Sequence, residues 1–370
     1  MSIEIRLLKE SEYEAANDFY NNTAKIYRQT HSASRTYTKF CWEFINCPYD
    51  KAIYAGAWES DEGKNPVLVG IQCVILLKMI DETGKQILSA KGEATLIELK
   101  AIIKHKKTDI LKELFNVLVQ ECRNRDIEFI WGFNTIPSTY KRLGCELPFK
   151  SYHAVHILNP GKAYKSITSL KTANTTAANI HLALRTGISY LFSLKTLFVS
   201  ASKGMYSFNS EWNENYSLFQ KASFPDKLLF LFQDKKYLNW KISENPYDIS
   251  YKSFQLLDEN KSIVAQVICS LRKEVAFIEQ TLFDNSIPVK SRQHFLKRIL
   301  NTLKKEHICL VRYTGFNSNR LNSAEMNLFK SLGFVFTGKG EWFTFKTLSA
   351  DSAVRPENIY LTRMYKQGVN

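Results

Sequence analysis

A short aromatic pattern occurs twice in this chain, roughly 200 residues apart. Tryptophan, proline, tyrosine and aspartate hold the same relative positions in residues 42–50 and in residues 240–248. A Leu-Gly pair follows each copy, beginning at Leu143 and at Leu332. A repeat over this distance indicates a duplicated domain, because the units of solenoid proteins are only about 20–50 residues long. The 370-residue chain is therefore predicted to hold two related domains.

The two copies also share an order of expected elements. Helices fall between strands, and hairpins open each copy, so each domain is predicted to be a mixed α/β unit in which helices flank a β-sheet. In the first copy we expect strands at 3–8, 52–58, 66–79, 92–103 and 128–133, a strand pair within 145–158, and helices at 11–28, 36–45 and 109–122. In the second copy we expect helices at 237–244, 292–305 and 324–332, and strands at 250–257, 262–270, 274–283, 308–313, 342–348 and 358–364.

A basic segment is expected to join the two domains. We place the first domain at residues 1–160, a helical bridge at 161–222 and the second domain at 223–370. Residues 1–160 carry 21 basic and 20 acidic side chains, so most of the net charge of +14 belongs to the bridge and the second domain. The apolar residues between 180 and 200 predict a helix that packs across both domains or one that lies on a membrane surface.

Several classes of protein are excluded by composition and spacing. No apolar run reaches the roughly 18 residues that a membrane span needs, and the start of the chain lacks the pattern of a signal peptide. Seven cysteines without a C-x-x-C pair argue against a disulfide framework and against a zinc site. His153 and His156 lie three apart in an expected strand and so face opposite ways, which disfavours a shared metal. We expect a cytoplasmic protein without a metal site.

The segment that follows the strand at 128–133 resembles part of a known family. It begins with Asn134 and continues through Tyr140 to the Leu-Gly pair at Leu143. A strand that ends in Asn and leads to Tyr-x-x-Leu-Gly resembles a signature of the GNAT acyltransferase superfamily. The second copy has Phe329 where the tyrosine would stand. The repeated Trp and Pro-Tyr pattern is similar to that of bacterial GNAT-type proteins linked to surface polysaccharides.

The resemblance implies two tandem GNAT-like domains that bind acetyl-CoA or another acyl-CoA. A pyrophosphate is best held by backbone N–H groups at a helix N-terminus, usually in a loop rich in glycine. The matching stretches of both copies lack glycine, and in the first copy Asp109 stands where an anion would bind. The residues that the resemblance assigns to donor binding in the first copy are Lys104, Lys106, Lys107, Thr108 and Asn134.

The reaction of the superfamily needs an acid for the leaving thiolate and a base for the acceptor amine. Tyr140 stands at the position of the usual acid, although a tyrosine there can also simply pack under the Leu-Gly turn. Glu93 and Glu98 are the candidate bases. They are five apart in an expected strand, so at most one of them faces the cleft, and either can be an ordinary surface carboxylate.

Three functions remain open from the sequence. The first is an N-acyltransferase that moves an acyl group from acyl-CoA to an amino group, which the polysaccharide resemblance places on an amino sugar or nucleotide sugar. The second is a transferase similar to the Fem peptidoglycan enzymes, which use aminoacyl-tRNA; the basic second half fits such a donor. The third is a non-catalytic scaffold. The repeated tryptophans are predicted to be core elements, with an aromatic lining for a sugar as the alternative.

Overall fold

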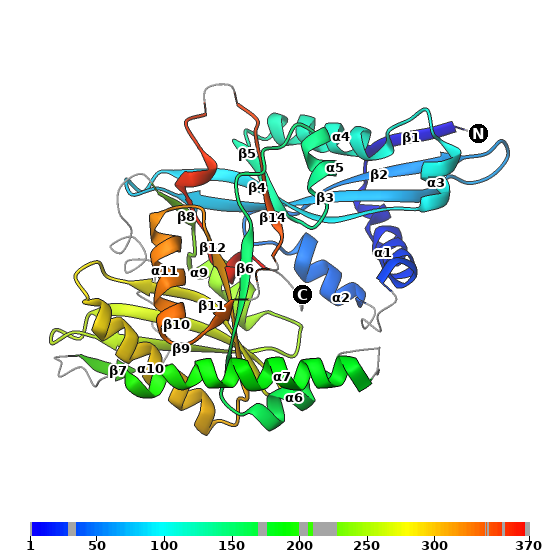
Figure 1. Cartoon of the computed structure of the whole chain (residues 1–370). Helices are drawn as coiled ribbons and strands as arrows, with labels where there is room; N and C mark the ends of the chain where they lie inside the picture. Colours follow the sequence, from blue (N-terminus) through cyan, green and yellow to red (C-terminus); the bar gives the residue numbers. More distant parts are fainter. Residues whose placement is uncertain are drawn as a thin grey trace.

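The computed structural model describes residues 2–28, 35–168, 176–199, 206–209, 228–336, 338, 340–349 and 352–366. Its strands form two mixed sheets with a shared hydrophobic core between them, and helix α4 covers the outer side of the first sheet while α10 and α7 lie beyond the second (Figure 1). Residues of both sheets, such as Trp131 and Phe316, belong to that shared core. The mixed α/β architecture predicted from the sequence is confirmed.

The first sheet has the strand order β1-β2-β3-β4-β5-β14, and β8 pairs with both β3 and β15. Its strands are β1 Ser2–Leu7, β2 Ile53–Ser60, β3 Val67–Ile80, β4 Gln86–Ile97, β5 Phe129–Asn134, β8 Leu229–Leu231, β14 Trp342–Thr347 and β15 Ile359–Tyr360. The helices beside it are α1 Tyr13–Arg28, α2 Tyr37–Phe40, α3 Leu99–Lys104, α4 Ile110–Asn124 and α5 Pro137–Arg142.

The second sheet has the order β13-β6-β12-β11-β10-β9-β7. Its strands are β6 Ser151–Ile157, β7 Ser207–Asn209, β9 Ser250–Leu257, β10 Ile263–Arg272, β11 Val275–Phe283, β12 Leu310–Phe316 and β13 Val335–Phe336. The helices beside it are α6 Pro160–Thr168, α7 Thr176–Ser193, α9 Lys235–Leu238, α10 Val289–Lys305 and α11 Arg320–Ser331.

The two halves of the chain exchange strands. Strand β6 comes from the first half but runs antiparallel to β12 in the second sheet. Strand β14 comes from the second half but runs antiparallel to β5 in the first sheet. The expected strand pair within 145–158 is therefore wrong, because alternating polarity tells which face a side chain takes and not which strand lies beside it. The domain boundaries at 1–160, 161–222 and 223–370 remain a prediction from the sequence repeat.

The end of β4 also differs from the expected strand at 92–103. Strand β4 stops at Ile97, and helix α3 begins at Leu99 with Glu98 as its N-cap residue. Within α3 only Ala101 is buried, so its apolar residues do not alternate between core and solvent as strand residues would. Helix α4 agrees with the sequence, since Asp109 caps its first turn and apolar side chains at helical spacing enter the core.

The repeated tryptophans meet where the two copies join. Trp42 lies in the helical turn η2 (Cys41–Ile45) and Trp240 in η4 (Asn239–Ser243). Their rings stack with centroids 4.9 Å apart and planes at 18°. The Nε1–H of Trp42 donates to the carbonyl of Trp240 at 2.8 Å, and that of Trp240 donates to the carbonyl of Trp42 at 2.9 Å. Each tryptophan thus donates to the other in the same way, as expected when an approximate two-fold axis relates the two copies. Both rings are buried, so they are core elements.

The described part of the expected bridge contains α7. Its side chains Leu182, Thr186 and Ser193 are buried, and the Ser193 hydroxyl accepts the backbone N–H of Ile157 in β6 at 2.9 Å. The opposite side of α7 exposes large apolar side chains, with Ile180, Leu184, Ile188 and Leu191 all at least 45% accessible. Among the helices that the structure describes, none combines the length and the hydrophobicity needed to cross a bilayer.

Candidate functional site

A fork opens between the two central parallel strands of the first sheet. The ladder between β4 and β5 covers only the pairs from Ser89 with Phe129 to Lys91 with Trp131. Beyond it β4 continues to Ile97 and β5 to Asn134. The facing edges past Lys91 and Trp131 therefore present backbone groups that an extended, amide-bearing ligand can pair with.

A bulge in β4 contributes to this opening. Glu93 pairs with Cys73 of β3, and Leu96 pairs with Ile71. Between these two pairs β4 advances by three residues and β3 by only two, and Ala94 takes a φ of 39°. Bulges of this kind bend a strand and interrupt its alternation of faces. The expectation that Glu93 and Glu98 face opposite ways assumed an unbroken strand, and that assumption is wrong.

Two glycines form the base of the fork. Gly92 follows the last paired residue of β4, and Gly132 follows the last paired residue of β5. A Cβ atom placed on Gly132 would lie 3.4 Å from the carbonyl oxygen of Gly92. A small cavity of about 20 Å³ lies here, bounded by both glycines together with Gln72 and Tyr140. Glycine keeps the two backbones accessible at this point.

Tyr140 lies at this fork on α5. Its hydroxyl oxygen is 3.4 Å from Oγ1 of Thr95 in β4. Burial raises the pKa of Tyr140, while hydrogen bonds with Thr95 and Gln72 act in the opposite direction. The phenol therefore holds its proton at neutral pH. Gly144 ends α5 with a φ of 74°, which explains the glycine of the Leu-Gly pair as a helix stop.

Asn134 ends β5 at the open side of the fork. Within the part of the chain that the structure describes, neither the amide nitrogen nor the amide oxygen of its side chain has a hydrogen-bond partner, although both atoms are buried. A buried amide without partners costs free energy, and such groups in native proteins usually meet water or a ligand. Asn134 is thus a candidate ligand contact, and its role in donor binding stays a prediction.

Glu93 pairs with a buried lysine that the sequence analysis did not single out. The Glu93 carboxylate forms an ion pair with the ammonium group of Lys91, whose side chain is only 4% accessible. Burial, followed by the ammonium groups of Lys366 and Lys241, lowers the pKa of Lys91 to about 7. The carboxylate of Glu341 acts against that shift in the pKa.

Glu98 lies away from this pair, at the start of α3. Its backbone N–H donates to the carbonyl of Val69 at 2.9 Å, and its carboxylate makes no capping hydrogen bond. Of the two candidate bases, only Glu93 is on the strand where the ladder ends. The role of either carboxylate in catalysis stays a prediction.

The predicted phosphate loop connects α3 to α4. Lys104 is in an ion pair with Glu59, while the side chains of Lys106 and Lys107 are exposed. The N–H of Thr108 donates to the carbonyl of His105 at 2.9 Å, closing a turn. At the N-terminus of α4 the carboxylate of Asp109 accepts the N–H of Lys112 and lies 3.3 Å from the Arg142 guanidinium. The capping aspartate thus already occupies the place of an anion.

The second sheet contains a corresponding fork. Strands β11 and β12 pair in parallel only from Val275 with Leu310 to Ile278 with Tyr313. Phe329, which replaces the tyrosine, is fully buried and stacks on Tyr313 at 3.9 Å. A pocket of about 340 Å³ lies near this fork, between β11, α10 and α11. Burial raises the pKa of Glu325, which lines it, to about 7.

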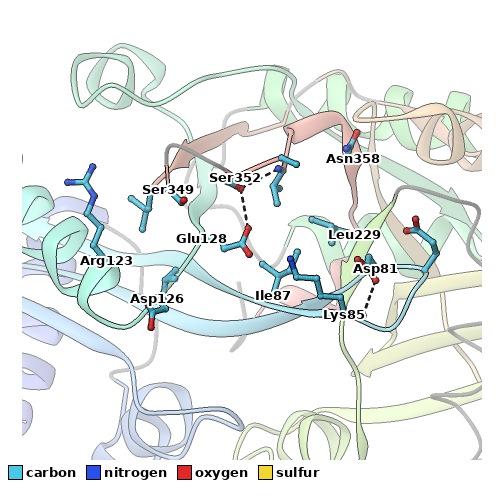
Figure 2. A pocket seen from close by; sticks show the side chains of 15 residues that line it. Asp81, Lys85, Ile87, Arg123, Asp126, Glu128, Leu229, Ser349, Ser352 and Asn358 are labelled. Atoms are coloured by element: carbon cyan, nitrogen blue, oxygen red, sulfur yellow. Dashed lines mark hydrogen bonds between the residues drawn. The ribbon is translucent and has the colours of Figure 1, made fainter.

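A larger hollow of about 810 Å³ lies at the other end of β4 and β5 (Figure 2). Two of the carboxylates that line it are engaged within the fold. The carboxylate of Asp81 accepts backbone N–H groups of its own hairpin at Thr83 and Lys85, both at 2.9 Å. The carboxylate of Glu128 accepts the Ser352 hydroxyl at 3.1 Å. We assign no chemistry to this hollow. Among the described residues no cluster of histidine, cysteine and carboxylate side chains could hold a metal ion.

No protein-family model and no curated protein sequence matches the chain. Among solved structures, a conserved protein of Enterococcus faecalis V583, described as a probable N-acyltransferase, is 8% identical with a TM-score of 0.60, covering 94% of this chain and 73% of its own. A tandem GNAT protein from the clavulanic acid biosynthesis pathway is 9% identical with a TM-score of 0.56, covering 95% of this chain and 100% of its own.

The N-myristoyltransferase of Saccharomyces cerevisiae, solved with myristoyl-CoA, is 12% identical with a TM-score of 0.54, covering 98% of this chain and 83% of its own. All three likenesses extend over nearly the whole of this chain, across both sheets. The chain therefore has a tandem GNAT fold, as the resemblance in its sequence predicted.

Proposed function

We propose that this protein is an N-acyltransferase that uses acyl-CoA and carries out the transfer at the fork between β4 and β5. The observation that carries the proposal is the fork itself, with open strand edges, glycines at its base and the unsatisfied amide of Asn134 at its end. The pantetheine arm of coenzyme A is an extended chain with two amide groups, and such a chain can pair with open strand edges.

In the proposed reaction the acceptor nitrogen attacks the thioester carbonyl. The new C–N bond forms as the C–S bond breaks, and Tyr140 gives its proton to the departing thiolate. Its raised pKa supports the role of an acid. Glu93 is the proposed base for the proton that leaves the nitrogen, because it lies on β4 next to the last paired residues of the fork.

The phosphates of the donor are proposed to meet the loop between α3 and α4. Lys106 and Lys107 are exposed there and can act as point charges. Lys104 and Thr108 belong to the same loop, but Lys104 already pairs with Glu59. Because Asp109 caps α4, the backbone of that helix contributes less than a glycine-rich loop would.

The acceptor is proposed to be an amino sugar or nucleotide sugar of surface polysaccharide synthesis, in the cytoplasm. The support is the repeated Trp and Pro-Tyr pattern, which resembles proteins of that setting. The second copy is proposed to support the fold and the acceptor, since Phe329 is a core residue and cannot act as an acid.

The direct test follows the release of free thiol from acetyl-CoA with a panel of amines. The panel contains amino sugars, nucleotide-linked amino sugars and small amino acids, with an aminoacyl-tRNA transfer assay in parallel. Thiol release that depends on an amine and disappears in Tyr140→Phe supports the proposal. Transfer from aminoacyl-tRNA without any thiol release, or no transfer at all with the panel, would count against it.

A further inference from the structure

Three arginines surround one aromatic ring between the two sheets. Arg272 ends β10, Arg312 lies on β12, and Arg363 lies in the short helical turn η6 (Arg363–Tyr365) near the C-terminus. Their guanidinium carbons lie 5.0, 5.6 and 4.2 Å from the ring centroid of Phe277. We call Arg272, Arg312 and Arg363 the arginine cluster. The three guanidinium groups therefore lie close to the same Phe277 ring.

Arg363 and Arg312 of the arginine cluster differ in their partners. Nε of Arg363 lies 3.5 Å from the carboxylate of Glu279, and both side chains are nearly inaccessible. For Arg312, among the described residues, the structure gives no ion pair, and its buried Nε has no hydrogen-bond partner. Burial, and after it the charge of Arg363, lowers the pKa of both Arg312 and Arg272. The charge of Arg363 thus acts on both other arginines, and the Nε of Arg312 is left without a partner among the described residues.

Further cations extend the positive region toward the fork. Lys366 follows the turn η6 and lies 3.7 Å from Glu341, while buried Lys241 donates to the backbone carbonyl of Lys366. After burial, the charges of Lys366 and Lys241 are the next largest causes that lower the pKa of Lys91 at the fork. Cations next to the arginine cluster therefore act electrostatically on Lys91, at the end of the β4–β5 ladder.

The turn η6 connects the arginine cluster physically to the fork. Tyr365 lies two residues after Arg363 and stacks on Phe133 of β5, with centroids 5.1 Å apart and planes at 15°. The ammonium group of Lys91 lies 5.5 Å from the same tyrosine ring. A molecule bound at Arg363 would thus lie near Tyr365, whose ring contacts residues of both strands where transfer is proposed.

We propose that the arginine cluster binds an anionic group of the acceptor, a phosphate or a carboxylate, and so brings the acceptor amine to the fork. Planar guanidinium groups bind such anions through paired hydrogen bonds. The buried Nε of Arg312, which has no partner among the described residues, lies beside Arg363 at the Phe277 ring and can donate to such an anion. The proposal rests on the proposed function for the identity of the acceptor. It narrows the substrate class to amines that carry an acidic group.

The test titrates the full-length protein with pyrophosphate, inorganic phosphate and succinate at constant ionic strength, by calorimetry. Arg312→Gln is the main variant, because Arg312 is half-buried with no ion pair in the described structure. Arg298→Gln is the matched control, since Arg298 also stacks on a phenylalanine, Phe208, at 4.4 Å but lies on α10. We expect Arg312→Gln to weaken binding of the preferred anion at least tenfold and Arg298→Gln to leave it within twofold. Equal binding by both variants overturns the proposal.

A second variant gives an effect of opposite sign. Glu279→Gln removes the carboxylate that competes with a bound anion for Arg363, so we expect tighter anion binding together with a lower melting temperature. Loss of folding cannot produce tighter binding, and unchanged or weaker anion binding by this variant contradicts the proposal. Preference for pyrophosphate over succinate indicates a phosphorylated acceptor, and the reverse preference indicates a carboxylate.

Acetyl-CoA titrations separate this site from the donor site. We expect Arg312→Gln to bind acetyl-CoA within twofold of the unchanged protein, because Arg312 is on β12 of the second sheet whereas the phosphate loop connects α3 to α4 beside the first sheet. Loss of acetyl-CoA binding in Arg312→Gln assigns the cluster to the donor and overturns the acceptor proposal. If no form of the protein binds acetyl-CoA while the anion titrations behave as expected, the proposed function fails and the anion site stands.

Discussion

Replacing either repeated tryptophan by phenylalanine should destabilise the whole protein more than a tryptophan-to-phenylalanine change elsewhere. In Trp240→Phe the carbonyl of Trp42 loses its donor at 2.9 Å, and in Trp42→Phe the carbonyl of Trp240 loses its donor at 2.8 Å. Leaving a buried acceptor unsatisfied costs about 1–3 kcal/mol. The smaller ring buries less apolar area, roughly 40 Å² less, which adds about 1 kcal/mol. Each variant should therefore lose about 2–4 kcal/mol of unfolding free energy.

The matched control is Trp58→Phe. Trp58 is also buried, but within the described structure its Nε1–H has no hydrogen-bond partner, so the change removes ring area without breaking a hydrogen bond. Its expected cost is about 1 kcal/mol from area alone. Unfolding in urea, followed by far-ultraviolet circular dichroism, measures all three variants without relying on tryptophan fluorescence.

The urea curves also test whether the two copies unfold together. Because the reciprocal bonds and the exchanged strands join the sheets, a single transition with a lowered midpoint is expected for Trp42→Phe and Trp240→Phe. If these variants cost no more than Trp58→Phe, the reciprocal hydrogen bonds do not stabilise the junction. Two separate transitions in the unchanged protein would refute the idea of one cooperative unit.

Three further predictions follow from the site. Tyr140→Phe should lower kcat at least tenfold in a thiol-release assay while the Kd for acetyl-CoA stays within twofold, because only the proton donor is lost. Lys106→Ala combined with Lys107→Ala should weaken acetyl-CoA binding more than Lys104→Ala in calorimetry, since Lys104 already pairs with Glu59; equal losses would contradict this. Burial in the folded protein raises the pKa of Glu325 from 4.5 to about 7. The stability that the protonated Glu325 contributes is therefore present below about pH 4.5 and is lost, by about 3 kcal/mol, as the pH rises through 7. Glu325→Gln should flatten that part of a curve of unfolding free energy against pH.

Much of the fold could be predicted because duplication and periodicity are properties of the sequence itself. The repeat at Trp42 and Trp240 predicted two copies, and the helical spacing after Asp109 predicted α4. The exchange of β6 and β14 could not be predicted in the same way. Alternation fixes the face of each side chain, but the partner of a strand depends on how the two sheets pack as wholes.

Only the residues of the candidate site that lie in one continuous segment could be predicted from the sequence. Asn134 and Tyr140 belong to a single strand-turn-helix segment, and the structure places both at the fork. Lys91 was missed because it precedes the expected strand at 92–103 and stands among the polar residues Ser89 and Glu93 of β4. The arginine cluster had no local signal, because its members come from distant segments and each alone resembles an ordinary surface charge.

The most direct test of the central claim is calorimetric binding of acetyl-CoA to the unchanged protein, to Gly132→Val and to Gly187→Val. A side chain on Gly132 enters the fork beside Gly92, whereas a Cβ on Gly187 in α7 meets no atom within 4 Å. We predict binding by the unchanged protein and by Gly187→Val, and no detectable binding by Gly132→Val with its circular dichroism spectrum retained. Equal binding by Gly132→Val and Gly187→Val would contradict the placement of the donor in the β4–β5 fork.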